Sequence, residues 1–312
     1  MTWALVALLG YFFSAIAAVF DKYLLSDRIP TPAVYAFFVS LFSLFALGFI
    51  PFGFQQSDVQ TTVTLLLSGM LFVYGLVAFY AAIKRHEISR VAPLVGTVIS
   101  LVAFLAVFVP GMSGESHVGA QAILALIFLI AGGLLISFDL PLRKRDHLSR
   151  YIFVAGLLMG GSLLLLKEGY THTNFQTGLV WSRLGMTLAG LTLLLIPLFR
   201  EQILAQLRGF AHRSSRATST GALFLLNKMT AGIASFLIAY AISLGAVSFV
   251  QALSGMQYVF ILCLMLPLSL RYPGIFGERL FFWDWFQKAV AVVIIGSGLW
   301  LATMSGVPLF LV

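Results

Sequence analysis

Apolar runs about as long as a lipid bilayer is thick fill this sequence almost from end to end. Charged or turn-forming residues bound each run, and we place the runs at residues 2–20, 32–51, 61–83, 89–109, 118–138, 150–167, 176–199, 218–242, 247–268 and 286–306. Only 10% of the residues are charged and 60% are hydrophobic, which excludes a soluble globular chain. The runs predict an all-α integral membrane protein with ten transmembrane helices, whose short loops leave no room for a large catalytic domain.

The lysines and arginines set the expected orientation, because they gather in alternate loops. Most of the 19 lie in the first, third, fifth, seventh and ninth loops between the predicted spans, whereas Lys167 borders the opposite side. Loops rich in these residues stay in the cytoplasm. We therefore expect both termini on the extracytoplasmic side of a bacterial plasma (inner) membrane. We interpret the net charge of +8 as topology and contact with the lipid bilayer, and expect no nucleic-acid partner.

The two halves of the chain share a repeated pattern. Residues 88–94, Ile-Ser-Arg-Val-Ala-Pro-Leu, recur 159 positions later as residues 247–253, Val-Ser-Phe-Val-Gln-Ala-Leu. Each copy continues into an apolar helix, a Gly-Glu turn at Glu115 or Glu278, and a closing glycine-rich helix. Five helices per copy is an odd number, so the second copy enters the membrane from the opposite face. The pattern predicts two inverted five-helix repeats, residues 1–145 and 146–312.

These repeated motifs resemble the drug/metabolite transporter superfamily, specifically its EamA-like branch. The resemblance covers essentially the whole chain. It is carried by the two helix starts, the two Gly-Glu turns and the glycine-rich fifth helix of each half, in the same order in both halves. The resemblance implies a ten-helix carrier built from two five-helix repeats.

Two basic residues lie well inside predicted spans, whereas the acidic residues lie in loops or at predicted helix ends. At about 1.5 Å per residue, Lys228 is about 15 Å into the eighth span and Arg183 about 10 Å into the seventh. Charges at such depth are costly and mark functional sites. We expect both to contact the substrate; the alternative is that they bond helix carbonyls and hold the bundle together. With no buried acid expected, they favour an anionic or zwitterionic substrate.

Polar residues on neighbouring spans complete the candidate site. They share helix faces with small residues, which suits a cavity as well as helix packing. The candidate substrate-binding residues are Lys228, Arg183, Tyr80, Thr97, Ser100, Gln251, Ser254 and Tyr258. The pairs Asp21-Lys22 and Lys167-Glu168 close the first helix of each half, either as gate ion pairs or as interfacial anchors.

Signatures of enzymes and metal sites are missing from the sequence. It has no His-Glu-x-x-His, no Gly-x-Ser-x-Gly and no phosphate-binding glycine loop with a lysine, and Cys263 is its one cysteine. We therefore expect no catalytic residue, metal or cofactor. The expected function is secondary-active or facilitative transport of a small polar metabolite, such as an amino acid or organic acid, by alternating access in a monomer or homodimer. A lipid-linked sugar flippase and a non-transporting membrane scaffold are the alternatives.

Overall fold

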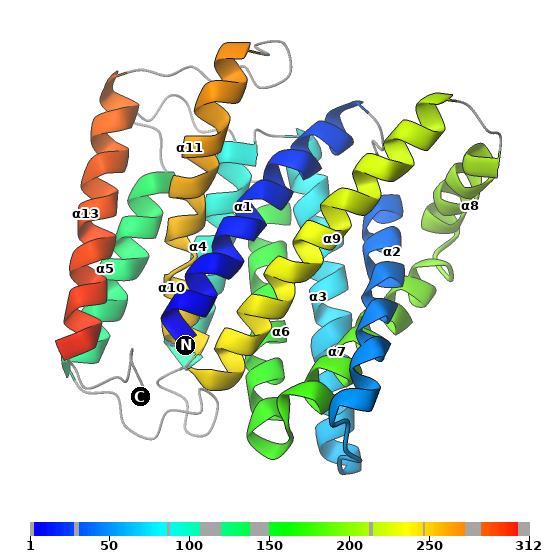
Figure 1. Cartoon of the computed structure of the whole chain (residues 1–312), viewed down its shortest axis with the longest axis horizontal. Coiled ribbons are helices and arrows are strands. Elements are labelled where there is room, and N and C mark those ends of the chain that lie inside the picture. Colours follow the sequence, from blue (N-terminus) through cyan, green and yellow to red (C-terminus); the bar gives the residue numbers. More distant parts are fainter. Residues whose placement is uncertain are drawn as a thin grey trace.

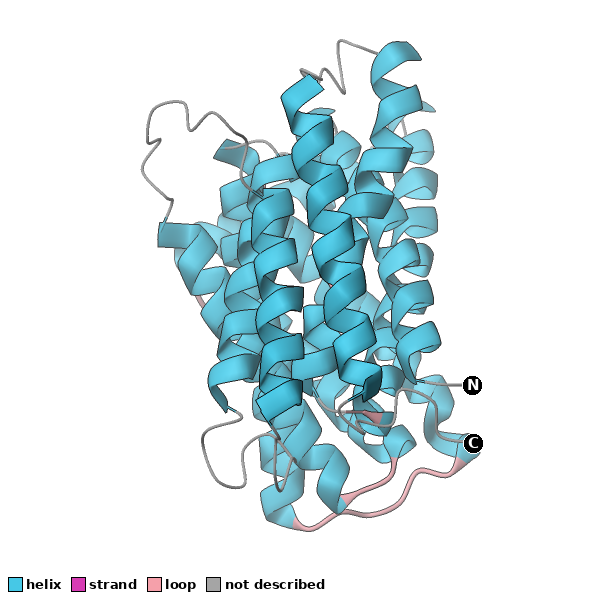
Figure 2. Cartoon of the chain, turned by 90° about the vertical axis from the view of Figure 1, so that its left-hand side faces the viewer, coloured by secondary structure: helices cyan, strands magenta, loops and turns pink. Residues whose placement is uncertain are grey.

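The computed structural model describes residues 3–27, 31–85, 88–106, 120–137, 150–211, 215–245, 247–271 and 282–304. Every regular element in these ranges is a helix (Figures 1 and 2). In chain order they are α1 (Trp3–Asp27), α2 (Pro32–Phe42), the 3-10 helix η1 (Ser43–Phe52), α3 (Val59–Arg85), α4 (Ile88–Ala106), α5 (Ala120–Ser137), α6 (Arg150–His172), α7 (Phe175–Leu193), α8 (Pro197–Ala211), α9 (Ser215–Leu244), α10 (Val247–Ala252), α11 (Gly255–Arg271) and α13 (Phe282–Met304). The all-helical fold class is confirmed for the described part of the chain.

Several of these helices have the length and composition of membrane spans. Within the described residues, five segments qualify: Trp3–Asp21, Pro32–Phe52, Val59–Lys84, Arg150–His172 and Gly221–Leu244. Large apolar side chains such as Leu67 and Val293 lie exposed on the outside of the bundle, as lipid contact requires. The chain is therefore suited to cross a membrane several times.

Three of the differences between the helices and the predicted spans concern the arrangement around the bundle interior. First, α1 continues to Asp27, so Asp21 lies inside a helix and not at its end. Second, the span predicted at 176–199 is broken, and α7 and α8 meet at 99°. Proline at position 197 explains this break, because it lacks an N–H and disfavours helical geometry in the residue before it. Third, the span predicted at 247–268 is interrupted at Leu253 and Ser254, between α10 and α11.

Helices from the two predicted halves pack on each other throughout the bundle. Helices α1, α3 and α5 belong to the first half. Of these, α1 packs along α9, α3 along both α6 and α7, and α5 along α13, all of which belong to the second half. The start of α1 and the end of α13 lie at the same, lower end of the bundle in Figure 1. The Gly-Glu turns at Glu115 and Glu278 and the predicted boundary between residues 145 and 146 lie outside the described residues.

The contact between α3 and α7 is very close because glycines face each other across it. A Cβ atom on Gly69 would meet the Ser182 carbonyl oxygen and come within 2.6 Å of the Met186 nitrogen. A Cβ atom on Gly185 would meet the backbone of Leu66. This approach holds α7 against α3 and sets the position of the side chains that α7 directs inward.

We expect Gly69→Ala to lower the free energy of unfolding by about 1–3 kcal/mol, because the added methyl group forces two helix backbones apart. Gly161→Ala is the matched control, since a Cβ there meets nothing within 4 Å and alanine favours the helix by up to about 1 kcal/mol. Thermal unfolding of the purified variants in detergent measures both. Equal melting temperatures for the two variants would contradict the close packing of α3 on α7.

Candidate functional site

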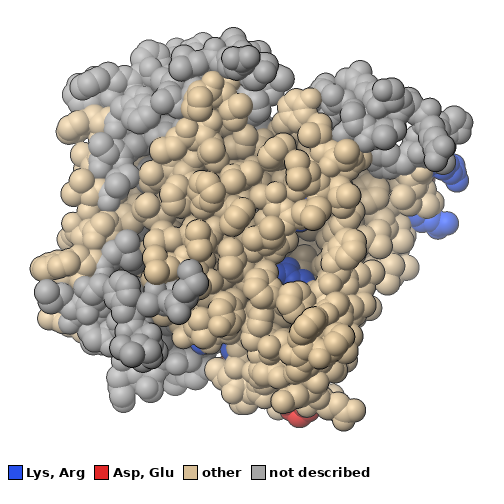
Figure 3. Space-filling view, in the orientation of Figure 1, with Lys and Arg blue, Asp and Glu red and all other residues tan. Residues whose placement is uncertain are grey.

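A cavity of about 490 Å³ lies inside the bundle, within the range of small-molecule binding sites. Apolar and aromatic side chains form most of its wall, which comes from α1, α2, η1, α3, α4, α6, α7, α9, α10 and α11. Figure 3 shows basic side-chain atoms inside an opening in one face of the molecule. The lining includes the predicted residues Lys228, Arg183, Tyr80, Gln251, Ser254 and Tyr258.

The predicted residues Thr97 and Ser100 lie apart from this cavity. They border a crevice of about 10 Å³ between α4, α5 and α11, which is too small for a metabolite. The Ser100 hydroxyl donates to the Gln251 carbonyl at 3.0 Å, and the Tyr258 hydroxyl donates to the Ala92 carbonyl at 2.8 Å. These bonds join α4 to the α10–α11 segment.

Lys228 has an acidic partner, contrary to the expectation that no acid neutralises it. Its Nζ donates to Asp21 Oδ1 at 3.0 Å, and the two side chains are 5% and 13% exposed. The expectation was wrong because the predicted first span ended at residue 20, whereas α1 continues past Asp21 and turns its carboxylate inward. The apolar residues Tyr23 and Leu24, which follow the Asp-Lys pair, are the sequence signal for this extension.

Two further residues that sequence reasoning missed hold the Asp21 carboxylate. The Tyr35 hydroxyl and the Asn227 amide both donate to Oδ1, the same oxygen that accepts from Lys228. The Lys228 ammonium also lies 4.3 Å from the centre of the Tyr35 ring and 5.4 Å from that of Phe224. An ammonium over aromatic faces gains a favourable cation–π interaction. The pair is therefore surrounded by groups that stabilise both charges.

Aromatic packing places this ion pair at the contact of three helices. The Tyr35 ring stands edge-on to Tyr80 of α3, with centroids 4.7 Å apart, and to Phe224 of α9, with centroids 5.3 Å apart. The ion-pair cluster, which we define as Asp21, Tyr35, Asn227 and Lys228, thus joins α1, α2 and α9.

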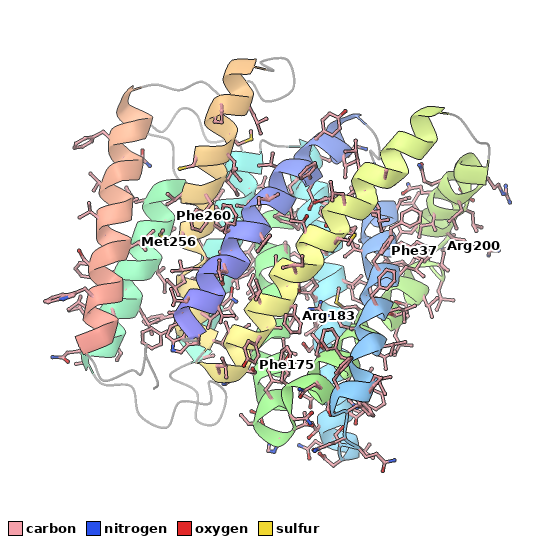
Figure 4. The ribbon with its side chains drawn as sticks, in the orientation of Figure 1. Phe37, Phe175, Arg183, Arg200, Met256 and Phe260 are labelled. Carbon is pink, nitrogen blue, oxygen red and sulfur yellow. The ribbon has the colours of Figure 1, made fainter. Side chains whose placement is uncertain are left out.

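Arg183 differs from Lys228 because its recorded partners in the described residues are neutral. Its Nη2 donates to the Ser235 hydroxyl at 2.7 Å, and Nη1 lies 3.0 Å from the Met186 sulfur. A guanidinium has five N–H donors, so further donors remain for a ligand in the cavity. Figure 4 places Arg183 in the interior of the bundle, whereas Arg200 lies at its edge.

Polar bonds fix the segment of α7 that carries Arg183. The Asn174 side chain caps this helix by accepting from the Thr177 N–H at 2.9 Å, and it donates to the Gly53 carbonyl at 2.7 Å. The Ser43 hydroxyl contacts the Arg183 carbonyl at 2.9 Å. The bond from Asn174 to Gly53 and the bond from Ser43 to Arg183 tie α7 to η1 and the turn after it. Arg183 therefore has a defined position at the cavity wall.

The two cations lie at different levels of the cavity. Ser235, the partner of Arg183, is two helical turns beyond Lys228 on α9, a separation of about 10 Å. Among the described residues that line the cavity, the charged ones are thus the Asp21–Lys228 pair at one level and Arg183 at the other. Among the described residues, no three His, Cys, Asp or Glu side chains are grouped as a metal site.

The second acid–base pair considered from the sequence has a different role. Lys167 Nζ donates to the Ile242 and Gly245 carbonyls at 3.0 and 2.8 Å, at the end of α9. Glu168 pairs with His172 at 3.1 Å on the exposed end of α6. Lys167 therefore stabilises a helix terminus, where a cation complements the helix dipole.

Comparison with known proteins shows what this fold is similar to. No family model and no curated protein matches the sequence. Several solved structures match, and one of them, named only "Crystal structure of protein", has a TM-score of 0.60 at 14% sequence identity. The match covers 97% of this chain and 95% of that chain. At this identity the likeness concerns the fold alone, which extends over nearly the whole length of both chains.

A double-mutant cycle tests the Asp21–Lys228 pair. We expect Asp21→Asn and Lys228→Met each to lower the free energy of unfolding by about 3 kcal/mol, because each leaves the other charge buried without its partner. The double variant should lose much less than the sum of the two single losses, since it buries no unpaired charge. Thermal unfolding in detergent gives the comparison. Additive losses would mean that the two charges do not interact in the protein.

Proposed function

We propose that this chain is a ten-span membrane carrier of a small polar metabolite, in the EamA-like manner that its repeated motifs imply. The observation that carries the proposal is a cavity of metabolite size that holds Arg183, a cation without a recorded acidic partner in the described residues. A scaffold has no use for a buried charge of this kind, which is costly unless a ligand compensates it. The carrier would use this cavity as its substrate site.

Helix packing supports two inverted five-helix repeats. Exchanging the halves would match α1 with α6, α3 with α9, and α4 with α11. The close pair α3–α6 then corresponds to the close pair α9–α1, and α4–α6 corresponds to α11–α1. Each partner in these correspondences is also a strongly packed pair, as inverted repeats require.

A correspondence beside the cavity is broken. The same exchange matches α3–α7, held together at Gly69, with α9–α2. Over their described residues, α9 and α2 are not closely packed, and side chains such as Tyr35 and Phe224 bridge them. In an alternating-access carrier this difference corresponds to a state with one side closed and the other side open. Closing α9 onto α2 would give the opposite state.

Charge determines the class of substrate we propose. Because Asp21 balances Lys228, Arg183 leaves one positive charge uncompensated among the described charges of the lining. A substrate with a carboxylate or phosphate group would supply the missing negative charge, so we favour an anionic or zwitterionic metabolite. From the distribution of basic loops we also propose that both termini lie outside a bacterial plasma membrane.

Replacing Arg183 tests this function. After a thermal-shift screen of small carboxylates, phosphates and amino acids has found a stabilising compound, we expect Arg183→Gln to weaken its binding about 10- to 100-fold, the loss of a charge-assisted hydrogen bond. Arg183→Lys should retain part of the binding, because it keeps the charge but loses the planar fork.

Arg200→Gln is the matched control, because Arg200 is exposed on α8 and outside the cavity lining. Binding by calorimetry and counterflow in proteoliposomes measure the effects. Undiminished binding and transport by Arg183→Gln would refute an anion site at this residue.

A further inference from the structure

The Asp21 carboxylate uses its two oxygens very unequally. Lys228, Tyr35 and Asn227 all donate to Oδ1, whereas no partner is recorded for Oδ2 among the described residues. Asp21 lines the cavity, and it is the more exposed member of the ion pair, at 13% against 5% for Lys228. A proton from the cavity could therefore reach Oδ2 without first breaking a hydrogen bond.

Asn227 provides a group that can respond to such a proton. It is fully buried, and its Oδ1 has no hydrogen-bond partner in the described structure. An unsatisfied buried acceptor is unfavourable, so its position beside a carboxylate requires an explanation. Rotation of the amide, together with a turn of the Asp21 carboxyl group that brings its protonated oxygen toward Asn227, would let this oxygen accept a hydrogen bond from the new O–H.

We propose that Asp21 is a proton-binding site that converts Lys228 into a second anion subsite, so that the carrier takes a dianion together with a proton. This inference rests on the proposed function and specifies its substrate class. In the unprotonated state Asp21 occupies Lys228, and the cavity accepts one negative charge at Arg183. When a solvent proton binds Asp21 Oδ2, the carboxylate loses its charge and the Lys228 ammonium needs another anion. A second acidic group of the substrate fills that place.

Charge balance links the two binding events. The described residues of the cavity lining carry one net positive charge when Asp21 is ionised and two when it is protonated. A monoanion therefore neutralises the cavity without a bound proton, whereas a dianion neutralises it only when one proton is bound. Proton binding and binding of the second anionic group therefore favour each other by the same factor, which for coupled sites is about 5- to 150-fold. The loaded cavity is electrically neutral in both cases.

The other groups that face Asp21 keep their charge in the neutral to acidic range. Tyr35 of α2 and Tyr80 of α3 carry phenols and Lys228 of α9 an ammonium, groups whose ordinary pKa values are about 10, and Asn227 of α9 does not ionise. Arg183 stays charged throughout. The proposed proton site among these groups is therefore Asp21.

Calorimetry with two permanently ionised probes tests the inference. Methanesulfonate is a monoanion and propane-1,3-disulfonate a dianion, and neither changes its charge between about pH 7.5 and about pH 5.5. Titrating wild-type protein in buffers of different ionisation enthalpy gives the protons taken up per bound probe. We expect none for methanesulfonate and close to one for the disulfonate at the higher pH. The affinity for the disulfonate should rise at the lower pH by a factor in the range of about 5 to 150.

Asp21→Asn should abolish proton uptake and bind the disulfonate equally well at both pH values, because asparagine mimics the protonated acid. Glu168→Gln is the control, since Glu168 lies at the exposed end of α6 and outside the cavity lining, and it should behave as wild type. The wild-type proton count remains decisive if Asp21→Asn fails to fold.

Binding of the disulfonate without proton uptake, or dependence on sodium in place of pH, would overturn the inference but leave the proposed function intact. The same holds if wild type binds methanesulfonate and not the disulfonate at either pH. Failure of wild type to bind either probe would contradict the proposed anion site, and the inference with it.

Discussion

A charge inside this bundle has little water to solvate it, and the ion pair between Asp21 and Lys228 is the arrangement that makes such charges tolerable. The ammonium lies 3.0 Å from the carboxylate, over the Tyr35 ring, and both side chains are nearly buried. Removing either charge leaves the other without its compensation. The pair also joins α1 to α9, the same two helices that pack along each other through much of the bundle. One interaction thus contributes both to the assembly of the helices and to the charge of the cavity.

The second constraint is that close helix packing and an open cavity must coexist. On one side, the facing glycines at positions 69 and 185 bring α3 and α7 together. On the other side, aromatic side chains span the distance between α2 and α9, and other residues of these two helices line the cavity. Aromatic contacts of this kind can rearrange at lower cost than a glycine-to-backbone contact can. The proposed opening and closing of the carrier therefore involves α9 and α2 more than α3 and α7.

Hydropathy predicted the all-helical class and the presence of several helices of spanning length, because apolar runs of membrane length leave the backbone few choices. The ends of helices were harder to predict. Tyr23 and Leu24 continue α1 beyond Asp21, whereas Pro197 breaks a run that is apolar on both sides. A solved structure has a similar fold over 97% of this chain. Its 14% identity concerns the fold alone and says nothing about function.

The candidate site was predicted in part. Intramembrane depth drew attention to Lys228 and Arg183, and both line the cavity. The partner of Lys228 could not be found from the sequence, because Asp21 is distant along the chain and becomes a partner only when α1 packs on α9. Tyr35 and Asn227 were missed for the same reason. Thr97 and Ser100 share the polar character of cavity residues but lie at a helix contact, a distinction that requires the packed structure.

The central claim is that the interior of this protein holds an anion beside Arg183. Anomalous diffraction from crystals grown with bromide, a monoanion with a strong X-ray signal, tests that claim most directly. The account predicts an anomalous peak in the cavity within contact distance of the Arg183 guanidinium, in addition to peaks at exposed basic residues. Bromide peaks confined to exposed basic residues, with none in the cavity, would contradict it.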